Sequence, residues 1–167
     1  MQIYESLNEY GSFVTSDMIG RNGHMRWPKA LDIVNGYWRF IPDKYKHNRL
    51  LNRYENLYEN WDCSKEGFEG IRSQEVLPLI FKQDFRCEIF IGFGNLIDIF
   101  IDRCFGHNFD INSMEDLAFI DMIQLRDELE LLSRNISPCH MLGVFTKKNL
   151  KLPFYSRGIN PLEIVFE

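Results

Sequence analysis

Between its first apolar strand and its first long helix, the chain reads Asp17-Met18-Ile19-Gly20-Arg21-Asn22-Gly23-His24-Met25-Arg26-Trp27-Pro28. Residues 12–17 have the pattern of a short strand, and Pro28 suits the first turn of a helix. Open α/β sheets place substrate groups in loops of this composition, at the carboxyl ends of their strands. The stretch therefore predicts an α/β fold with a site at this loop. A well hydrogen-bonded surface turn is the alternative.

The bulk composition is that of a single globular domain covering residues 1–167. Hydrophobic residues make up 45% of the chain and charged residues 26%, a balance typical of such domains. A net charge of −5 argues against a nucleic-acid partner that is bound by neutralising phosphates. No stretch approaches the ~18 apolar residues of a membrane span, and the first residues do not resemble a signal peptide. We therefore expect a cytoplasmic protein with no nucleic-acid and no membrane partner.

The four cysteines, at positions 63, 87, 104 and 139, lie far apart and form no C-x-x-C motif. Zinc sites and disulfide frameworks both require cysteines at recognisable spacings. Histidines and carboxylates also show no spacing that would gather them around a metal ion. We expect reduced, mostly buried thiols and no metal site.

Hydrophobic periodicity predicts strands and helices in alternation along the chain. Strand patterns cover residues 12–17, 85–91 and 139–146, and the second is the strongest because it is rich in β-favouring residues. Their order with the helical patterns predicts an α/β sheet covered by helices, with a helical insert at about residues 29–83. The helical patterns cover residues 28–41, 50–61, 73–81, 95–105 and 113–134.

The last of these helices has the clearest start signal in the chain. Ser113, followed by Asp116 three residues later, resembles a capping box. Apolar residues then recur at 4-3-4-3 spacing, which predicts an amphipathic helix. The residues of this stripe are Ala118, Met122, Leu125, Leu129 and Leu132. The tail from Lys147 shows no clear periodicity.

His24 is the histidine whose neighbours favour a role in a site. It shares its loop with Asp17, Asn22 and Arg26, and an imidazole can act as a general base near neutral pH. His47 lies among basic residues, a pattern typical of a solvent-exposed helix surface. His140 lies within a strand pattern. His107 follows an apolar helix and is read as a turn residue or a site residue.

Two further stretches have both a functional and a structural interpretation. Gly92-Phe93-Gly94 stands between a strand and a helix, as a dinucleotide fingerprint would. The third glycine position holds Ile97, which is too bulky for that motif and favours a plain strand exit. Residues 62–70 form a loop that either covers a substrate or connects two helices.

Several segments, taken together, resemble the carboxyl-terminal half of bacterial class I S-adenosylmethionine-dependent methyltransferases. They are residues 17–28, Glu66-Gly67-Phe68-Glu69-Gly70-Ile71-Arg72, and the run from Gly94 to Asp110. Leu7-Asn8-Glu9-Tyr10-Gly11, leading into residues 12–17, resembles the turn before the fifth strand of that family. The resemblance extends from about residue 7 to residue 147.

The resemblance implies a partial Rossmann-like methyltransferase sheet with covering helices. Residues 12–17, 85–91 and 139–146 would be the equivalents of strands five, six and seven, the last two antiparallel. Strand five would then be an exposed edge. The family's glycine-rich cofactor loop and ribose-binding carboxylate have no counterpart in this chain. A complete family member binds S-adenosylmethionine, whereas this chain alone is expected to bind none, and its cofactor-binding residues stay unknown.

The resemblance also implies roles for the loop residues. His24 or Asp17 would be the catalytic base, and Arg21, Asn22, Arg26 and Trp27 would bind a small-molecule substrate. A missing amino-terminal half, or a second copy joined through the exposed sheet edge, would be the protein partner. The alternative function is a non-catalytic, degenerate half-domain that acts as an interaction module.

Overall fold

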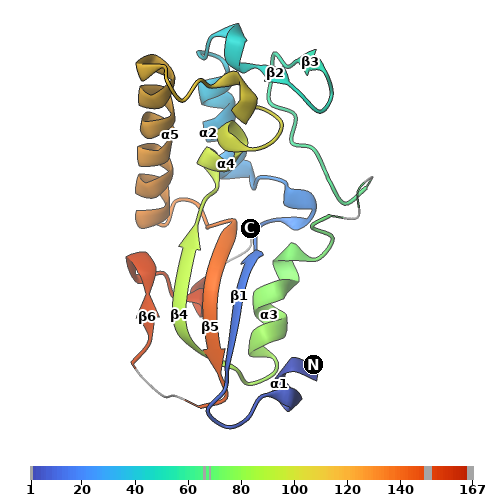
Figure 1. The fold of residues 1–167 in the computed structure, drawn as a ribbon, viewed down its shortest axis with the longest axis vertical. Coiled ribbons are helices and arrows are strands. Elements are labelled where there is room, and N and C mark those ends of the chain that lie inside the picture. The colour runs from blue at the N-terminus through green and yellow to red at the C-terminus, as the bar shows by residue number, and fades with distance from the viewer. Residues whose placement is uncertain (1, 66, 68, 149–151, 165–167) are drawn as a thin grey trace. The chain divides into compact units, whose positions relative to one another are not determined.

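A computed structural model describes residues 2–65, 67, 69–148 and 152–164 of the chain (Figure 1). The chain divides into two compact units. Unit 1 comprises the described residues of segments 1–25, 62–93 and 137–167, and unit 2 comprises residues 26–61 and 94–136. Each unit contains its own hydrophobic core. No helix in the described part of the chain is both long and apolar enough to cross a membrane.

Unit 1 is built on a four-stranded sheet with the order β1-β5-β4-β6. The strands are β1 (Ser12–Met18), β4 (Arg86–Phe93), β5 (His140–Thr146) and β6 (Phe154–Tyr155). β5 runs antiparallel to both β1 and β4, whereas β6 runs parallel to β4. The predicted strands at 85–91 and 139–146 are therefore antiparallel neighbours, as expected, and β1 lies at an edge of the described sheet.

The core of unit 1 forms where the sheet meets α1 (Gln2–Ser6) and α3 (Val76–Phe81). Figure 1 shows α3 beside β1. Phe145 of β5 lies in the middle of this core and is fully buried. A Cβ atom at Gly143 would lie 2.3 Å from the Phe145 ring, so only glycine leaves room for the ring there. Phe13 and Phe85 pack around the same ring.

The carboxyl-terminal tail contains structure that periodicity does not reveal. β6 adds to the free edge of β4 through only two residue pairs. It leads into two 3-10 turns, η5 (Ser156–Gly158) and η6 (Pro161–Glu163). The guanidinium of Arg157 in η5 donates to the carbonyl oxygen of Gly92 at 2.8 Å. This bond ties the tail to the end of β4.

Unit 2 is helical, with one small hairpin. Its helices are α2 (Pro28–Trp38), α4 (Leu96–Ile101) and α5 (Met114–Leu132). Its shorter elements are η2 (Asp43–Tyr45), η4 (Gly106–Asn108) and the hairpin of β2 (His47–Asn48) with β3 (Arg53–Tyr54). The Trp38 ring is fully buried and packs against Phe100 and Phe105. The predicted start of α5 is confirmed, because the Ser113 side chain accepts from the Asp116 N–H.

Two of the predicted helices differ in the structure. The prediction of a helix over 50–61 is wrong, because this stretch contains the β2–β3 turn and extended backbone. Asn52 in that turn has a φ of 49°, and the Asn48 side chain accepts from the N–H groups of Leu50 and Leu51. The helix predicted over 95–105 ends at Ile101. There the Asp102 carboxylate accepts from two backbone N–H groups of the next turn.

The apolar stripe predicted for α5 is not the face that packs into unit 2. Ile123 and Leu131 are fully buried together with three acids, whereas Leu125 is 61% exposed. The exposed side chains of the 4-3-4-3 stripe are Ala118, Met122, Leu125, Leu129 and Leu132. The helix therefore has an inner face with isolated apolar anchors and an outer face that is largely apolar.

Shortening one side chain on each face of α5 should lower the free energy of unfolding by different amounts. Ile123→Ala should lower the free energy of unfolding by about 2–5 kcal/mol, since it leaves a cavity in a fully packed core. Leu125→Ala on the exposed face should change it by no more than about 0.5 kcal/mol. Urea unfolding at a submicromolar protein concentration measures both. Equal losses in the two variants would mean that α5 packs through a different face.

Candidate functional site

The structure divides the predicted site residues between the two units. Asp17, Arg21, Asn22 and His24 belong to unit 1, and Arg26 and Trp27 belong to unit 2. Asp17 lies in β1 opposite Met141, and its side chain accepts from the N–H of Met18 at 2.8 Å. Asn22 and His24 lie in the 3-10 turn η1 (Asn22–His24).

In unit 1, the turn η1 is held against a loop from the middle of the chain. The N–H of Gly23 donates to the carbonyl oxygen of Gly70 at 2.8 Å, and the N–H of Cys63 donates to the carbonyl oxygen of Gly23 at 3.0 Å. Asn22 and Gln74 exchange two hydrogen bonds, each from a backbone N–H to the other side chain, at 3.1 Å. The Asn22 amide oxygen is therefore already engaged in a hydrogen bond within unit 1.

The His24 side chain packs onto Gly70. His24 has a φ of 57° and Gly70 a φ of 64°, so both occupy the left-handed region that favours glycine. A Cβ atom at position 70 would lie 2.6 Å from His24 Cε1. The Nδ1 atom of His24 is buried. The imidazole is thus placed at the exit of β1 by close contact with the 62–74 segment.

The same segment brings a carboxylate to the turn. A Cβ atom at Gly23 would lie 2.0 Å from Asp62 Oδ1, so Asp62 lies directly against the turn. Ser64 donates to Asp62 Oδ1 through its hydroxyl at 2.6 Å, and this bond is the main cause that lowers the pKa of Asp62. Residues 62–70, read from the sequence as a cover or a connection, are in contact with the predicted site loop. Glu66 and Phe68 lie outside the described residues.

Replacing Gly70 should loosen this contact. Gly70→Ala forces an alanine into the left-handed backbone region, at a cost of roughly 1–2 kcal/mol. Its methyl group also collides with the His24 ring. Amide hydrogen exchange at Gly23, whose N–H donates to Gly70, should then speed up by about tenfold or more, because about 1.4 kcal/mol corresponds to a factor of ten. Gly67→Ala is the matched control, since a Cβ atom there would meet its nearest neighbour at an ordinary 3.5 Å. Equal exchange in both variants would contradict the contact.

In unit 2, Arg26 is a buried anchor. Its Nε donates to the carbonyl oxygen of Asn95 at 2.9 Å, and its Nη2 lies 3.5 Å from Asp98 Oδ2. The side chain of Asn60 bonds both the N–H and the carbonyl oxygen of Arg26. These contacts hold the arginine against the start of α4. Trp27 is also buried and directly precedes α2.

The start of α4 also receives a buried carboxylate. Asp127 of α5 is completely buried, and its Oδ1 accepts from the N–H of Leu96 at 2.8 Å. Burial raises the pKa of Asp127 from an ordinary value of 3.8 to about 6. A phosphate bound in the manner of a dinucleotide fingerprint would need the amides at this helix start. Since the chain's own carboxylate already occupies the Leu96 amide, the arrangement favours the plain strand exit at Gly92-Phe93-Gly94.

The raised pKa of Asp127 makes stability depend on pH. The folded state binds the proton more tightly than the unfolded chain, so the free energy of unfolding should fall as pH rises from about 4 to about 6. Asp127→Asn keeps an acceptor for the Leu96 N–H and removes the buried charge. At neutral pH it should therefore stabilise the protein by roughly 3 kcal/mol, from ~1.4 kcal/mol per pKa unit over the rise from 3.8 to about 6.

Thermal unfolding at a series of pH values measures this effect. Asp32→Asn, at an exposed position of α2 in the same unit, is the matched control and should follow the wild-type profile. If Asp127→Asn follows it too, the Asp127 carboxyl does not titrate in this range.

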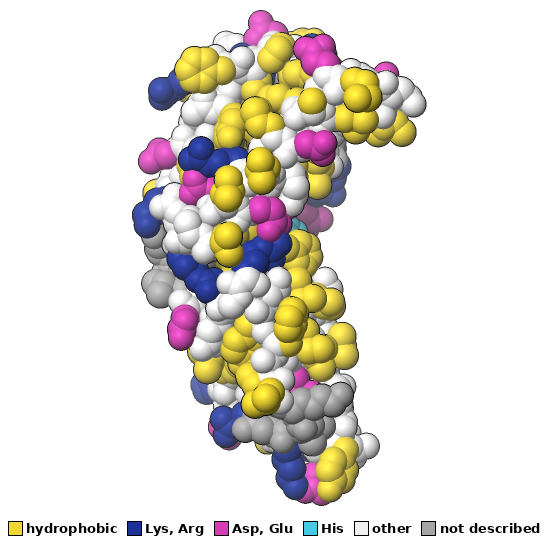
Figure 2. Space-filling view, turned by 90° about the vertical axis from the view of Figure 1, so that its left-hand side faces the viewer, with side chains coloured by type: hydrophobic (Ala, Val, Ile, Leu, Met, Phe, Trp, Pro, Cys, Tyr) yellow, Lys and Arg dark blue, Asp and Glu magenta, His cyan; other side chains and the backbone are white. Residues whose placement is uncertain are grey.

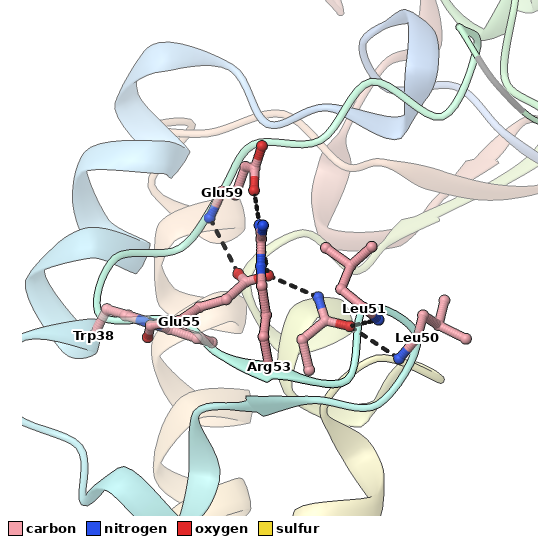
Figure 3. Close-up of polar contacts among 7 residues, drawn as sticks. Trp38, Leu50, Leu51, Arg53, Glu55 and Glu59 are labelled. Atoms are coloured by element: carbon pink, nitrogen blue, oxygen red, sulfur yellow. Dashed lines mark hydrogen bonds and ion pairs between the residues drawn. The ribbon is translucent and has the colours of Figure 1, made fainter.

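A polar network in unit 2 holds the β2–β3 hairpin, as Figure 3 shows. The buried Glu55 carboxylate accepts from the Asn48 side chain at 2.8 Å and forms ion-pair contact with Arg53 at 3.5 Å. Arg53 also pairs with Glu59. The indole N–H of Trp38 donates to the carbonyl oxygen of Glu55 at 2.8 Å. The burial of Glu55 explains why this stretch cannot follow the predicted helical stripe.

The hairpin turn forms one wall of a pocket of about 740 Å³ in unit 2. This volume lies within the range of small-molecule sites. Arg49 and Leu50 come from the turn, and the other walls come from α4, η4 and the first turns of α5. The remaining lining residues are Phe100, Ile101, Asp102, Arg103, Gly106, His107, Phe109, Asp110, Ile111, Asp116, Leu117 and Ile120. The sequence analysis did not identify this pocket.

Charged groups of this pocket have identified neighbours. Asp116 accepts from the Tyr45 hydroxyl at 2.6 Å, from Lys44 Nζ at 2.9 Å and from the Asp110 N–H at 2.9 Å. These bonds, that of Tyr45 first, hold the pKa of Asp116 well below its usual range. His107 Nε2 lies 3.2 Å from His47 Nδ1. Burial, followed by the charges of His47 and Arg49, lowers the pKa of His107.

The histidine pair was not predicted, because the two residues are 60 positions apart in the sequence. The signal that existed was local: His107 follows an apolar helix, in a turn. His107 comes close to His47 because His47 lies in the β2–β3 hairpin. The predicted helix over 50–61 left no place for this hairpin.

The described residues contain no group of three or more histidine, cysteine or acidic side chains arranged to hold a metal ion. All four cysteines are thiols, and burial raises the pKa of Cys87 to about 12. A thiol with so high a pKa is a poor nucleophile.

Comparisons with models of protein families, with curated proteins and with solved structures found no match to this chain.

Proposed function

We propose that the chain is a methyltransferase-related protein that carries the substrate-side half of an S-adenosylmethionine-dependent methyltransferase. The observation that carries the proposal is the contact between η1 and Gly70. Segments 17–28 and 66–72 belong to the set that, taken together, resembles class I methyltransferases. In the structure their described parts bond to each other through Gly23 and Gly70. The antiparallel pairing of β4 with β5, which the resemblance also implies, supports the proposal.

In this proposal the chain has no complete cofactor site of its own. α4 follows the strand exit at Gly92-Phe93-Gly94. The N–H of Leu96 at the start of α4 donates to the Asp127 carboxylate. S-adenosylmethionine supplies an activated methyl group when bound, so the protein's task is to align a nucleophilic atom with it. In this proposal the chain contributes to that alignment from the substrate side.

His24 is the proposed base for a hydroxyl substrate, because its imidazole is held at the exit of β1. Asp17 is the alternative base, and it is exposed within β1. Arg21, at the start of η1, is the proposed contact for a polar or anionic substrate. The Asn22 side chain bonds Gln74, and the Arg26 side chain bonds Asn95 and Asp98. In this proposal both residues therefore hold the local structure and do not bind the substrate directly. Trp27 would position the start of α2.

Calorimetric titration of S-adenosylmethionine tests the proposal. The chain alone should show no binding, because in this proposal it carries only the substrate-side half. Co-expression with the segment encoded immediately upstream of Met1 should restore binding and methyl transfer, and that segment should contain a glycine-rich loop after an apolar strand. Micromolar binding by the chain alone, or an unrelated upstream sequence, would contradict the proposal.

The reconstituted enzyme then tests His24. His24→Ala and His24→Gln should both lower turnover by roughly two to four orders of magnitude if the imidazole is the base. If the ring serves only for packing on Gly70, glutamine should restore much of the turnover that alanine loses. Melting temperatures measured on the same samples separate loss of the base from loss of folding.

The open edge of β1 favours a second candidate, an interaction module without catalysis. Among the described strands, β1 pairs with β5 only, so its other edge presents backbone groups to which an extended segment could add. In that case no upstream segment would restore cofactor binding.

A further inference from the structure

The outer face of α5 presents an apolar stripe that the described chain leaves exposed. Figure 2 views the protein from the side of α5 and shows hydrophobic side chains interspersed with charged ones. Along α5, Met122, Leu125, Leu129 and Leu132 are each about half exposed. We call Ala118 together with these four residues the outer seam. Contiguous exposed apolar residues of this kind mark interaction surfaces.

Specific contacts fix the orientation of α5, so the outer seam cannot be turned inward. Asp116 on the inner face bonds Tyr45 and Lys44, and Asp127 bonds the Leu96 N–H. Glu130 accepts from Arg126 Nε at 2.5 Å and from the Asn135 side chain. Ile123 and Leu131 are fully buried between these acids. A rotation that buried the leucines would break the bonds of Asp116 and Asp127 to other elements of unit 2 and would expose Ile123 and Leu131.

The spacing of the outer seam identifies the kind of surface it is. Its residues recur at intervals of 4-3-4-3, which is the 3.5-residue period of a coiled-coil seam. Met122 and Leu129 occupy the a positions of this heptad. Ala118, Leu125 and Leu132 occupy the d positions. A surface with this period fits a second helix with the same period.

We propose that the outer seam pairs with the outer seam of a second copy of this chain, in a parallel two-helix coiled coil. The charges beside the outer seam favour a second copy of this chain as the partner, and they favour the parallel over the antiparallel direction. In the same heptad, Asp121 and Glu128 are g positions and Arg126 is an e position. In a parallel pair, each g residue faces the e residue of the next heptad on the other helix. Asp121 of each copy therefore faces Arg126 of the other copy.

The same charges disfavour the antiparallel arrangement. There, g positions face each other, so that Asp121 would oppose Glu128 of the other copy. Arg126 bonds Glu130 through Nε, and its guanidinium has further N–H donors for a second carboxylate. The symmetric parallel pair thus forms two opposite-charge contacts, and the antiparallel pair forms two like-charge contacts.

The pairing would add little ordering cost. Unit 2 already holds α5 in helical form, so the cost of helix nucleation does not fall on association. The seam spans only about two heptads, which places the interface at the small, reversible end of homodimers. Dimer formation should therefore depend on concentration in the micromolar range.

Sedimentation equilibrium over a range of protein concentrations tests the proposal. The wild-type chain should pass from monomer to dimer as concentration rises. Leu125→Glu places two glutamates opposite each other at the centre of the seam and should weaken the dimer by about a hundredfold or more. Leu162→Glu is the matched control, because Leu162 is 67% exposed, lies outside α5 and receives the same charge change. It should dimerise as the wild type does.

Circular dichroism should show that both variants fold, since both side chains are exposed. A wild-type chain that stays monomeric at all concentrations would overturn the proposal, as would a Leu125→Glu variant that still forms dimers. A monomer that binds vesicles of phosphatidylcholine and phosphatidylglycerol through this face would also overturn it, and would assign the seam to lipid.

Cross-linking tests the direction of the helices. Leu132→Cys should form an intermolecular disulfide under mild oxidation, because parallel pairing brings the two 132 positions together. Leu162→Cys is the control and should not. Asp121→Arg should weaken the dimer, and Asp121→Arg combined with Arg126→Asp should restore it. A dimer that fails to cross-link, or that ignores the charge exchange, would overturn the parallel arrangement.

Discussion

The double pairing of β5 is the interaction on which the sheet of unit 1 depends. β5 bonds β1 along one edge and β4 along the other, over nearly its full length. Just before it, the carbonyl oxygen of Cys139 accepts from the N–H groups of Ile19 and Gly20. The central strand therefore sets not only the pairing of its neighbours but also the point at which the chain leaves β1 and enters η1. The position of His24 follows from that point.

The parts of the fold that could be predicted are those with a strong local pattern. The predicted strand at 85–91 is rich in β-favouring residues, and the predicted strand at 139–146 does pair with it, as β4 and β5. α2 begins at Pro28, and α5 is capped by Ser113. In each case the signal lies within a few residues and tertiary contacts reinforce it. The two-residue strand β6 gives no such signal, because its pairing with β4 lies far away in the chain.

The parts that failed are those where a polar group decides the packing. Leu50, Tyr54, Leu57 and Trp61 formed a helical stripe in the sequence, yet Glu55 between them is the buried residue. On α5, Leu125, Leu129 and Leu132 lie outside, while Asp127 and Glu130 lie inside. Hydrophobic periodicity treats an acid as a surface residue and cannot anticipate partners such as the Leu96 amide. The contact of His47 with His107 was hidden for the same reason, as was the pocket beside it. In the candidate site, the loop could be located, but the residues that clamp it could not.

The packing of the His24 ring on Gly70 has a consequence for how related sequences can differ. Both residues adopt positive φ, and the His24 ring occupies the space that a side chain at position 70 would need. A side chain at position 70 becomes compatible with the turn only where position 24 has lost its ring, for instance to asparagine or glycine, which tolerate this backbone conformation. A side chain at position 70 should therefore occur in evolution only together with a change at position 24. Such covariation would link two loops that are 46 residues apart in sequence, without any change in the strands that carry them.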